Sequence, residues 1–211
     1  RYLQKVKPER NIFRAHPWHG ISAGDEAPAV VTCYIEIVPT DTVKYELDKV
    51  SGHLTIDRPQ HFSSMCPTLY GLVPRTFCGE RVAARCRART GQNVARADGD
   101  PLDICVLTEK QILHGDILLD ASPIGGLRMI DNGEADDKII AVLRDDLVYG
   151  RMRDLADCHK AIVDRLVHYF LSYKRSPASE SPPASIAEIY DREEAHQTVR
   201  LACADYDERF A

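Results

Sequence analysis

Short apolar runs, separated by turn-forming residues, fill most of the first two thirds of the chain. Runs of this length that are continuously apolar or alternate with polar residues predict strands rather than helices. Lys49-Val-Ser-Gly52 lies between two such runs and predicts a hairpin turn. The expected strands are Val31–Val38, Val43–Asp48, His53–Asp57, 103–107, 116–130 and 138–143.

The last third of the chain changes to a helical period. Within Asp157–Lys174, apolar residues recur every three to four positions, which predicts an amphipathic helix. Residues 176–185 are rich in Ser and Pro and predict a linker. Ser185-Ile-Ala-Glu188 has the pattern of a capping box, so we expect a final helix to open there and to continue through Val199.

The order of these elements indicates the fold class. Many short strands followed by two helices predict an α+β fold built around a small barrel. A chain of 211 residues is long enough for one domain with a substantial core. The sequence contains no internal repeat and no second domain, so we expect a single domain over residues 1–211.

Charge and cysteine usage exclude some classes of function. The formal net charge of −5 argues against a general binder of nucleic acid or of anionic membranes. An anionic substrate would have to be drawn by bound metal or by clustered Lys and Arg. The seven cysteines contain no C-x-x-C and no zinc-like pairing, which favours reduced thiols. With no apolar export segment and no 18-residue apolar span, we expect a cytoplasmic protein.

The segment Asp98-Gly-Asp-Pro-Leu-Asp103 places three carboxylates within six residues. Three carboxylates this close repel one another and cannot all be buried as ions without a counter-charge. A divalent cation such as Mg²⁺ supplies that charge, because it takes oxygen ligands and shares them with substrate phosphates. The alternative is an acidic surface turn, since Asp, Gly and Pro all favour turns.

A second acidic cluster follows. Asp131 ends one apolar run, and Asp136 and Lys138 open the next. The two acids are therefore expected at opposite ends of a tight loop between two strands, with Lys138 just inside the second strand. Two carboxylate clusters at strand ends, together with a lysine, indicate a site for metal and phosphate rather than a solvated turn.

Residues 98–104, DGDPLDI, resemble the motif of the soluble family I inorganic pyrophosphatases. The resemblance implies a distorted five-stranded barrel similar to the OB fold, with helices packed outside it. It also implies hydrolysis of pyrophosphate to two phosphates, with several Mg²⁺ ions per active site. Further blocks similar to those of the family follow in order along most of the chain: 34–37, 43–48, 56–58, 67–71, 129–131, 136–138 and 173–174.

The resemblance also implies roles for the acids. Asp100 would accept the proton of the attacking water as general base; the alternative is that it is another metal ligand. Glu36 and Glu46 would hold metal-bound waters or orient Lys44. The expected metal ligands are Asp98, Asp103, Asp131 and Asp136.

The cationic and hydroxyl-bearing residues of these blocks would bind the oxygens of pyrophosphate. Tyr173 has a second interpretation, because it could simply close the apolar stripe of the preceding helix. The expected substrate-binding residues are Lys44, Arg58, Tyr70, Lys138, Tyr173 and Lys174.

The chain departs from the family pattern in two places. Residues 75–97 form an insertion with six arginines and a single acid, Glu80, and Glu80–Arg89 predicts a short helix that Thr90-Gly91 ends. It could be a basic flap over a phosphate site, but we expect a solvated, partly mobile excursion whose removal leaves activity largely intact. Cys66 stands where the family commonly has an active-site Tyr, so one hydroxyl contact is expected to be absent.

Two other functions remain open at this stage. One is a Mg²⁺-dependent phosphoesterase that acts on nucleotides or organic phosphates. The other is a non-catalytic barrel that binds nucleic acid or saccharide, against which the net acidity and the lack of stacking aromatic residues count. The resemblance further implies a homo-oligomer, either a hexamer as in bacterial-type members or a dimer as in larger eukaryotic ones.

Overall fold

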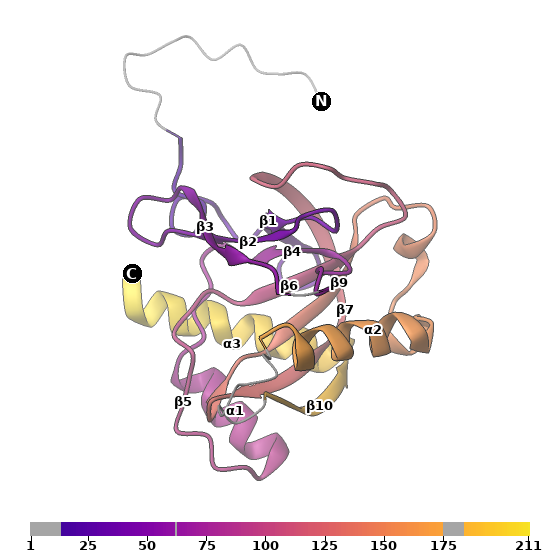
Figure 1. Ribbon diagram of the computed structural model, residues 1–211. Coiled ribbons are helices and arrows are strands. Elements are labelled where there is room, and N and C mark those ends of the chain that lie inside the picture. The colour runs from indigo at the N-terminus through magenta and orange to yellow at the C-terminus, as the bar shows by residue number, and fades with distance from the viewer. Residues whose placement is uncertain (1–13, 62, 175–183) are drawn as a thin grey trace.

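The structure is a computed structural model that describes residues 14–61, 63–174 and 184–211 (Figure 1). Five of its strands form a closed, uneven ring, because each pairs with the next and β7 returns to pair with β1. All neighbours are antiparallel except β6 and β9. The ring confirms the expected barrel. Its strands, in order, are β1 (Val31–Ile37), β4 (Leu69–Leu72), β6 (Asp103–Leu107), β9 (Lys138–Leu143) and β7 (Ile117–Asp131).

Further strands extend this framework. β7 has fifteen residues, so its first part belongs to the barrel while its last part projects beyond it. The projecting part pairs with β10 on one edge and with β8 at its end, and β8 in turn pairs with β5. A separate hairpin carries the turn predicted at 49–52. These strands are β2 (Val43–Leu47), β3 (Leu54–Pro59), β5 (Arg96–Ala97), β8 (Glu134–Ala135) and β10 (Ser185–Asp191).

The helices α1 (Glu80–Thr90), α2 (Lys160–Ser172) and α3 (Arg192–Phe210) cover the sheet from outside, with two 3₁₀ turns at Tyr149–Arg151 and Leu155–Asp157. Figure 1 shows α3 running beneath the barrel with α1 below it. One core lies between the barrel, α1 and α3, and another lies between the barrel and α2. Among the described residues, no helix is long and apolar enough to cross a membrane.

The start of the last helix differs from the prediction. Ser185–Asp191 is strand β10, and α3 begins at Arg192, where the Asp191 carboxylate accepts a hydrogen bond from the Glu194 amide at 3.0 Å. The capping-box prediction at 185–188 is therefore wrong. The projecting part of β7 would otherwise leave an open sheet edge, and pairing along that edge overrides the local helix signal. The linker predicted at 176–185 lies almost entirely outside the described residues.

The arginine-rich segment is part of the core. The predicted helix is confirmed as α1, which ends at Gly91 with a left-handed φ of 67°. Val82, Ala83 and Cys86 on α1 are buried in the core that α3 also covers. The expected solvated, partly mobile excursion is therefore wrong. These three apolar positions lie on one face of the helix, a signal that the arginines obscured.

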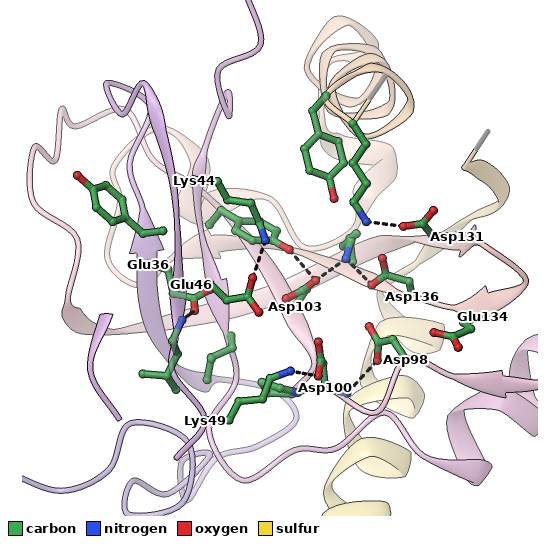
Figure 2. A pocket seen from close by; sticks show the side chains of 18 of the residues that line it. Glu36, Lys44, Glu46, Lys49, Asp98, Asp100, Asp103, Asp131, Glu134 and Asp136 are labelled. Atoms are coloured by element: carbon green, nitrogen blue, oxygen red, sulfur yellow. Dashed lines mark hydrogen bonds and ion pairs between the residues drawn. The ribbon is translucent and has the colours of Figure 1, made fainter. Parts of the chain in front are cut away.

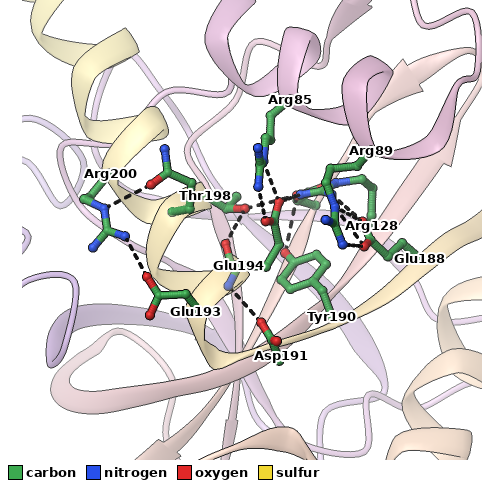
Figure 3. Close-up of polar contacts among 12 residues, drawn as sticks. Arg85, Arg89, Arg128, Glu188, Tyr190, Asp191, Glu193, Glu194, Thr198 and Arg200 are labelled. Carbon is green, nitrogen blue, oxygen red and sulfur yellow. Dashed lines mark hydrogen bonds and ion pairs between the residues drawn. The ribbon is translucent and has the colours of Figure 1, made fainter.

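Two arginines of α1 form ion pairs with neighbouring elements of the fold. Arg85 pairs with Glu194 of α3, and Arg89 pairs with Glu188 of β10 (Figure 3). Both acids also pair with Arg128 of β7, whose side chain is only 1% exposed. Arg85 and Arg89 therefore serve as counter-charges for carboxylates of other elements and need no anionic ligand.

We expect Val82→Ala to lower the free energy of unfolding by about 1.5–3 kcal/mol, because it removes buried methyl groups and leaves a cavity. Ala88→Gln, at an exposed position of the same helix, should change it by less than about 0.5 kcal/mol. Urea denaturation measures both values. Equal, negligible effects would mean that α1 is not part of the core.

Candidate active site

A pocket of about 310 Å³ lies where strands β6 and β9 begin, and Figure 2 shows its side chains pointing toward one another. All but one of the predicted site residues line it, although they come from six separate stretches of the chain. These residues are Glu36, Lys44, Glu46, Tyr70, Asp98, Asp100, Asp103, Asp131, Asp136, Lys138, Tyr173 and Lys174.

Strand register places the central charges. Asp103 opens β6, Lys138 opens β9, and the parallel pairing sets them side by side. The Lys138 ammonium is buried and donates hydrogen bonds to the carboxylates of Asp103 and Asp136. Burial alone would lower the pKa of Lys138, but these two charges raise it well above its usual value. The lysine therefore stays charged and partly neutralises the acids.

The acid loop, residues 98–103, depends on a glycine. Gly99 has a φ of 77°, which residues with a Cβ rarely adopt, and the turn lets the Asp100 amide donate to Asp98 Oδ1 at 3.1 Å. Leu102 is completely buried and fixes the exit of the loop. The side chain of Asp100 is 41% exposed, against 21% for Asp103. Asp100 is thus the more accessible of the two to solvent.

Asp98 and Asp136 share a site that cannot hold two free negative charges. Burial, with the charge of Asp136 adding to it, raises the pKa of Asp98 to about 9, although Lys138 opposes the shift. Burial also acts to raise the pKa of Asp136, but hydrogen bonds and charge from Lys138 bring it below its usual range. Without a cation, the Asp98–Asp136 pair therefore keeps one proton near neutral pH.

This donor set fits a hard divalent cation, because it consists of carboxylate oxygens in a polar pocket. Among the described residues, no three side chains of metal-binding type already surround a single point. The ammonium of Lys138 lies between Asp103 and Asp136, and that of Lys174 pairs with Asp131. The lysines thus supply the counter-charge that a cation would otherwise provide.

Tyr70, Glu46 and Glu36, which also line the pocket, make different contacts. The Tyr70 hydroxyl donates to Asp103 Oδ2 at 2.6 Å. Lys44 donates to Glu46 at 2.8 Å, as expected for an acid that orients it. Glu36 instead accepts from the Leu47 amide at 2.7 Å, and burial raises its pKa to about 8. Glu36 therefore ties strand β1 to β2 rather than contacting Lys44.

Tyr173 lies both at the pocket and in the core. It lines the pocket, and its ring also stacks on Tyr169 with centroids 5.0 Å apart in the core beneath α2. Lys174, the next residue, donates to the carboxylate of Asp131, and both residues line the pocket.

Arg58 is the predicted residue that does not line the pocket. It pairs with Asp57 at 2.6 Å, and its guanidinium carbon lies 5.8 Å from the centroid of the Tyr173 ring. Its Nη2 is buried without a hydrogen-bond partner in the part of the chain that the structure describes. Cys66 is buried in the core with α2 and does not line the pocket, which agrees with the expected loss of a hydroxyl contact.

Seven lining residues were not predicted from the sequence, and two of them, Lys49 and Glu134, are charged. Lys49, in the β2–β3 turn, donates to the Asp100 carboxylate, and Glu134, in β8, accepts from Arg96 at 2.6 Å. Lys49 was interpreted only as part of a hairpin turn, and its acid partner is 51 residues away. No residue of the 75–97 segment lines the pocket, so the flap interpretation is wrong.

Together, the barrel and a polar pocket lined by carboxylates and lysines fit a class of protein, the metal-dependent hydrolases of phosphoric anhydrides or esters. Residues 33–207 match the family model described as inorganic pyrophosphatase. The inorganic pyrophosphatase of Chlamydia muridarum is 53% identical over 195 residues, which cover 90% of this chain and 93% of that relative. The soluble inorganic pyrophosphatase of Oryza sativa subsp. japonica is 37% identical over 188 residues, which cover 89% and 78%.

Structural similarity agrees with these matches. The inorganic pyrophosphatase of Thermus thermophilus gives a TM-score of 0.76 at 27% identity and covers 92% of this chain and 99% of its own. The chain belongs to the inorganic pyrophosphatase family. It is accordingly a hydrolase that acts on inorganic pyrophosphate, with a divalent metal as cofactor.

Because the Asp98–Asp136 pair keeps a proton near neutral pH in the metal-free protein, binding of a divalent ion there should release it. We expect the apparent affinity for Mg²⁺ to rise with pH by up to about tenfold per unit and to level off above about pH 9. Calorimetry in buffers of different ionisation enthalpy measures the protons released. Asp98→Asn should weaken binding and abolish this linkage, whereas an affinity independent of pH in the wild type would contradict the assignment.

Proposed function

We propose that pyrophosphate binds in this pocket and that Asp100 accepts the proton of the attacking water. The observation that carries the proposal is the position of Asp100. It belongs to the same short loop as Asp98 and Asp103, but its carboxylate is more exposed than that of Asp103 and does not pair with Lys138. A general base must reach a water in the pocket, while a metal ligand must share its charge with other ligands.

The remaining acids are proposed to hold the metal. Asp98, Asp103, Asp131 and Asp136 present oxygen donors to one pocket, and their mutual repulsion favours a bound cation. We propose Mg²⁺ as the ion, with several ions per site. When bound, the metal would neutralise charge on the substrate and lower the pKa of a coordinated water.

The cations are proposed to hold the two phosphates. Lys44, Lys138 and Lys174 each pair with an acid at the pocket, so phosphate oxygens would compete for donors that are already positioned. Arg58 would contribute its buried, unpartnered Nη2 from the edge of the site. Tyr70 and Tyr173 would add hydroxyl contacts, and their side chains are fixed by packing.

We further propose that residues 1–211 form one domain with an insertion at 75–97 and that the chain assembles as a homo-oligomer, a hexamer or a dimer. Its seven cysteines are all free thiols and six of them are buried, which supports a cytoplasmic location.

Substrate class and metal can be tested together by measuring phosphate release from pyrophosphate, ATP and p-nitrophenyl phosphate. We expect turnover of pyrophosphate in Mg²⁺, loss of turnover in EDTA, and inhibition by excess Ca²⁺. Ca²⁺ is larger and takes looser, higher coordination, so it would occupy the carboxylates but orient the water poorly. Full turnover in EDTA or in Ca²⁺ alone would contradict the metal assignment, and a preference for p-nitrophenyl phosphate would favour a phosphoesterase.

The general base is tested by Asp100→Asn, which keeps the side-chain volume but cannot accept a proton. We expect kcat to fall by roughly 10²–10⁴, with little change in Mg²⁺ affinity. The matched variant Asp103→Asn should weaken metal binding, so much of its loss should be recovered at high Mg²⁺. Recovery of Asp100→Asn by raised Mg²⁺ would instead identify Asp100 as a metal ligand.

A further inference from the structure

The residues that lead into α1 hydrogen-bond to the backbone of the acid loop. The Cys78 amide donates to the Asp100 carbonyl at 2.8 Å, and the Gly99 amide donates to the Cys78 carbonyl at 3.1 Å. Two residues earlier, the buried Thr76 hydroxyl accepts from the Leu102 amide at 2.8 Å. Because these bonds reach main-chain atoms of residues 99–102, they fix the path of the loop itself.

The same segment is anchored on its other side by α3. Asp205 of α3 is buried, and its carboxylate accepts from the amides of Gly79, Arg81 and Val82 at 3.0, 3.1 and 3.2 Å. The Arg81 guanidinium adds a further bond at 3.0 Å. The N-cap of α1 is a glycine without a side-chain cap, so Asp205 satisfies from a neighbouring helix the free amides that a capping side chain would satisfy.

The opposite flank of the acid loop is held by the other end of the 75–97 segment. Strand β5 pairs with β8, and the Asp98 amide donates to the Ala135 carbonyl at 3.1 Å. The loop is therefore clamped between residues 76–82 and the 131–136 hairpin.

We propose that Thr76 and Asp205 are positioning residues for the proposed general base and its loop. We call residues 76–82 the supporting segment. Thr76 belongs to this segment and Asp205 anchors it, and neither residue lines the pocket. This inference rests on the proposed function of Asp100. An in-line attack needs the base within a fraction of an ångström, and a displacement of about 1 Å can cost about 10² in rate.

The clamp should affect turnover rather than substrate affinity. The proposed phosphate-binding cations Lys44, Arg58 and Lys138 lie on β2, β3 and β9, and Lys174 follows α2. None of these elements is held by the supporting segment. Loss of the clamp should therefore move Asp100 relative to a substrate whose own contacts persist.

Four variants test the proposal. Thr76→Val keeps the shape of the side chain but loses the hydroxyl, and Thr76→Ser keeps the hydroxyl. Asp205→Ala removes the anchor, and Glu208→Gln removes only the second, exposed partner of Arg81. We expect Thr76→Val and Asp205→Ala to lower kcat about 10- to 100-fold with KM for pyrophosphate within about twofold. Thr76→Ser and Glu208→Gln should stay within about threefold of wild type.

Hydrogen exchange of the metal-free protein supplies a readout that does not depend on activity. In Thr76→Val and Asp205→Ala, the amides of Gly99, Asp100 and Leu102 should exchange at least about tenfold faster, while those of β9 stay protected. Asp205→Asn, which keeps one acceptor oxygen, serves if Asp205→Ala does not fold. The proposal would be overturned if these folded variants kept the exchange rates and the kcat of the wild type. It would also be overturned if kcat and the affinity for pyrophosphate fell by the same factor.

Failure of the proposed function looks different. In that case Asp100→Asn would keep full activity, while the exchange rates of residues 99–102 would still report whether the supporting segment holds the loop.

Discussion

The burial of Lys138 among carboxylates is the constraint on which the site depends. Its side chain is 3% exposed and pairs with Asp103 and Asp136, and the charge of Asp136 helps to raise the pKa of the neighbouring Asp98. Burying such charges is costly unless they are well paired, so the strands must meet in one register. The parallel β6–β9 pair of the barrel supplies that register, since it sets Asp103 opposite Lys138. A slip of one residue would turn one of the two side chains to the other face.

The sequence predicted most of the barrel and most of the charged residues of the pocket. Strand runs and the stripe of α2 follow from local period, and the acids could be found because they cluster near strand ends. It did not predict β10, because the capping-box pattern at 185–188 is local whereas the edge of β7 that β10 covers is not. It also missed Lys49, whose partner Asp100 comes close only after the β2–β3 hairpin folds back.

The arginine-rich segment shows why charge content is a poor guide to ligand binding. Two of its arginines, Arg85 and Arg89, pair with acids of α3 and β10 (Figure 3). The buried Arg128 of β7 pairs with the same two acids. Arg128 also pairs with Asp137 at 3.3 Å, next to Asp136 of the pocket. The network therefore connects the core beneath α1 to the edge of the site. Paired in this way, the arginines stabilise packing instead of attracting an anion from solvent.

The central claim is that the carboxylates around Lys138 form a cation site. Anomalous scattering from crystals soaked in Mn²⁺ tests it most directly, because Mn²⁺ prefers the same oxygen ligands and its position can be seen independently of activity. We expect anomalous peaks in the pocket, between the carboxylates of Asp98, Asp103, Asp131 and Asp136. Crystals that bind Mn²⁺ only elsewhere, or that show no peak in this pocket at saturating Mn²⁺, would contradict it.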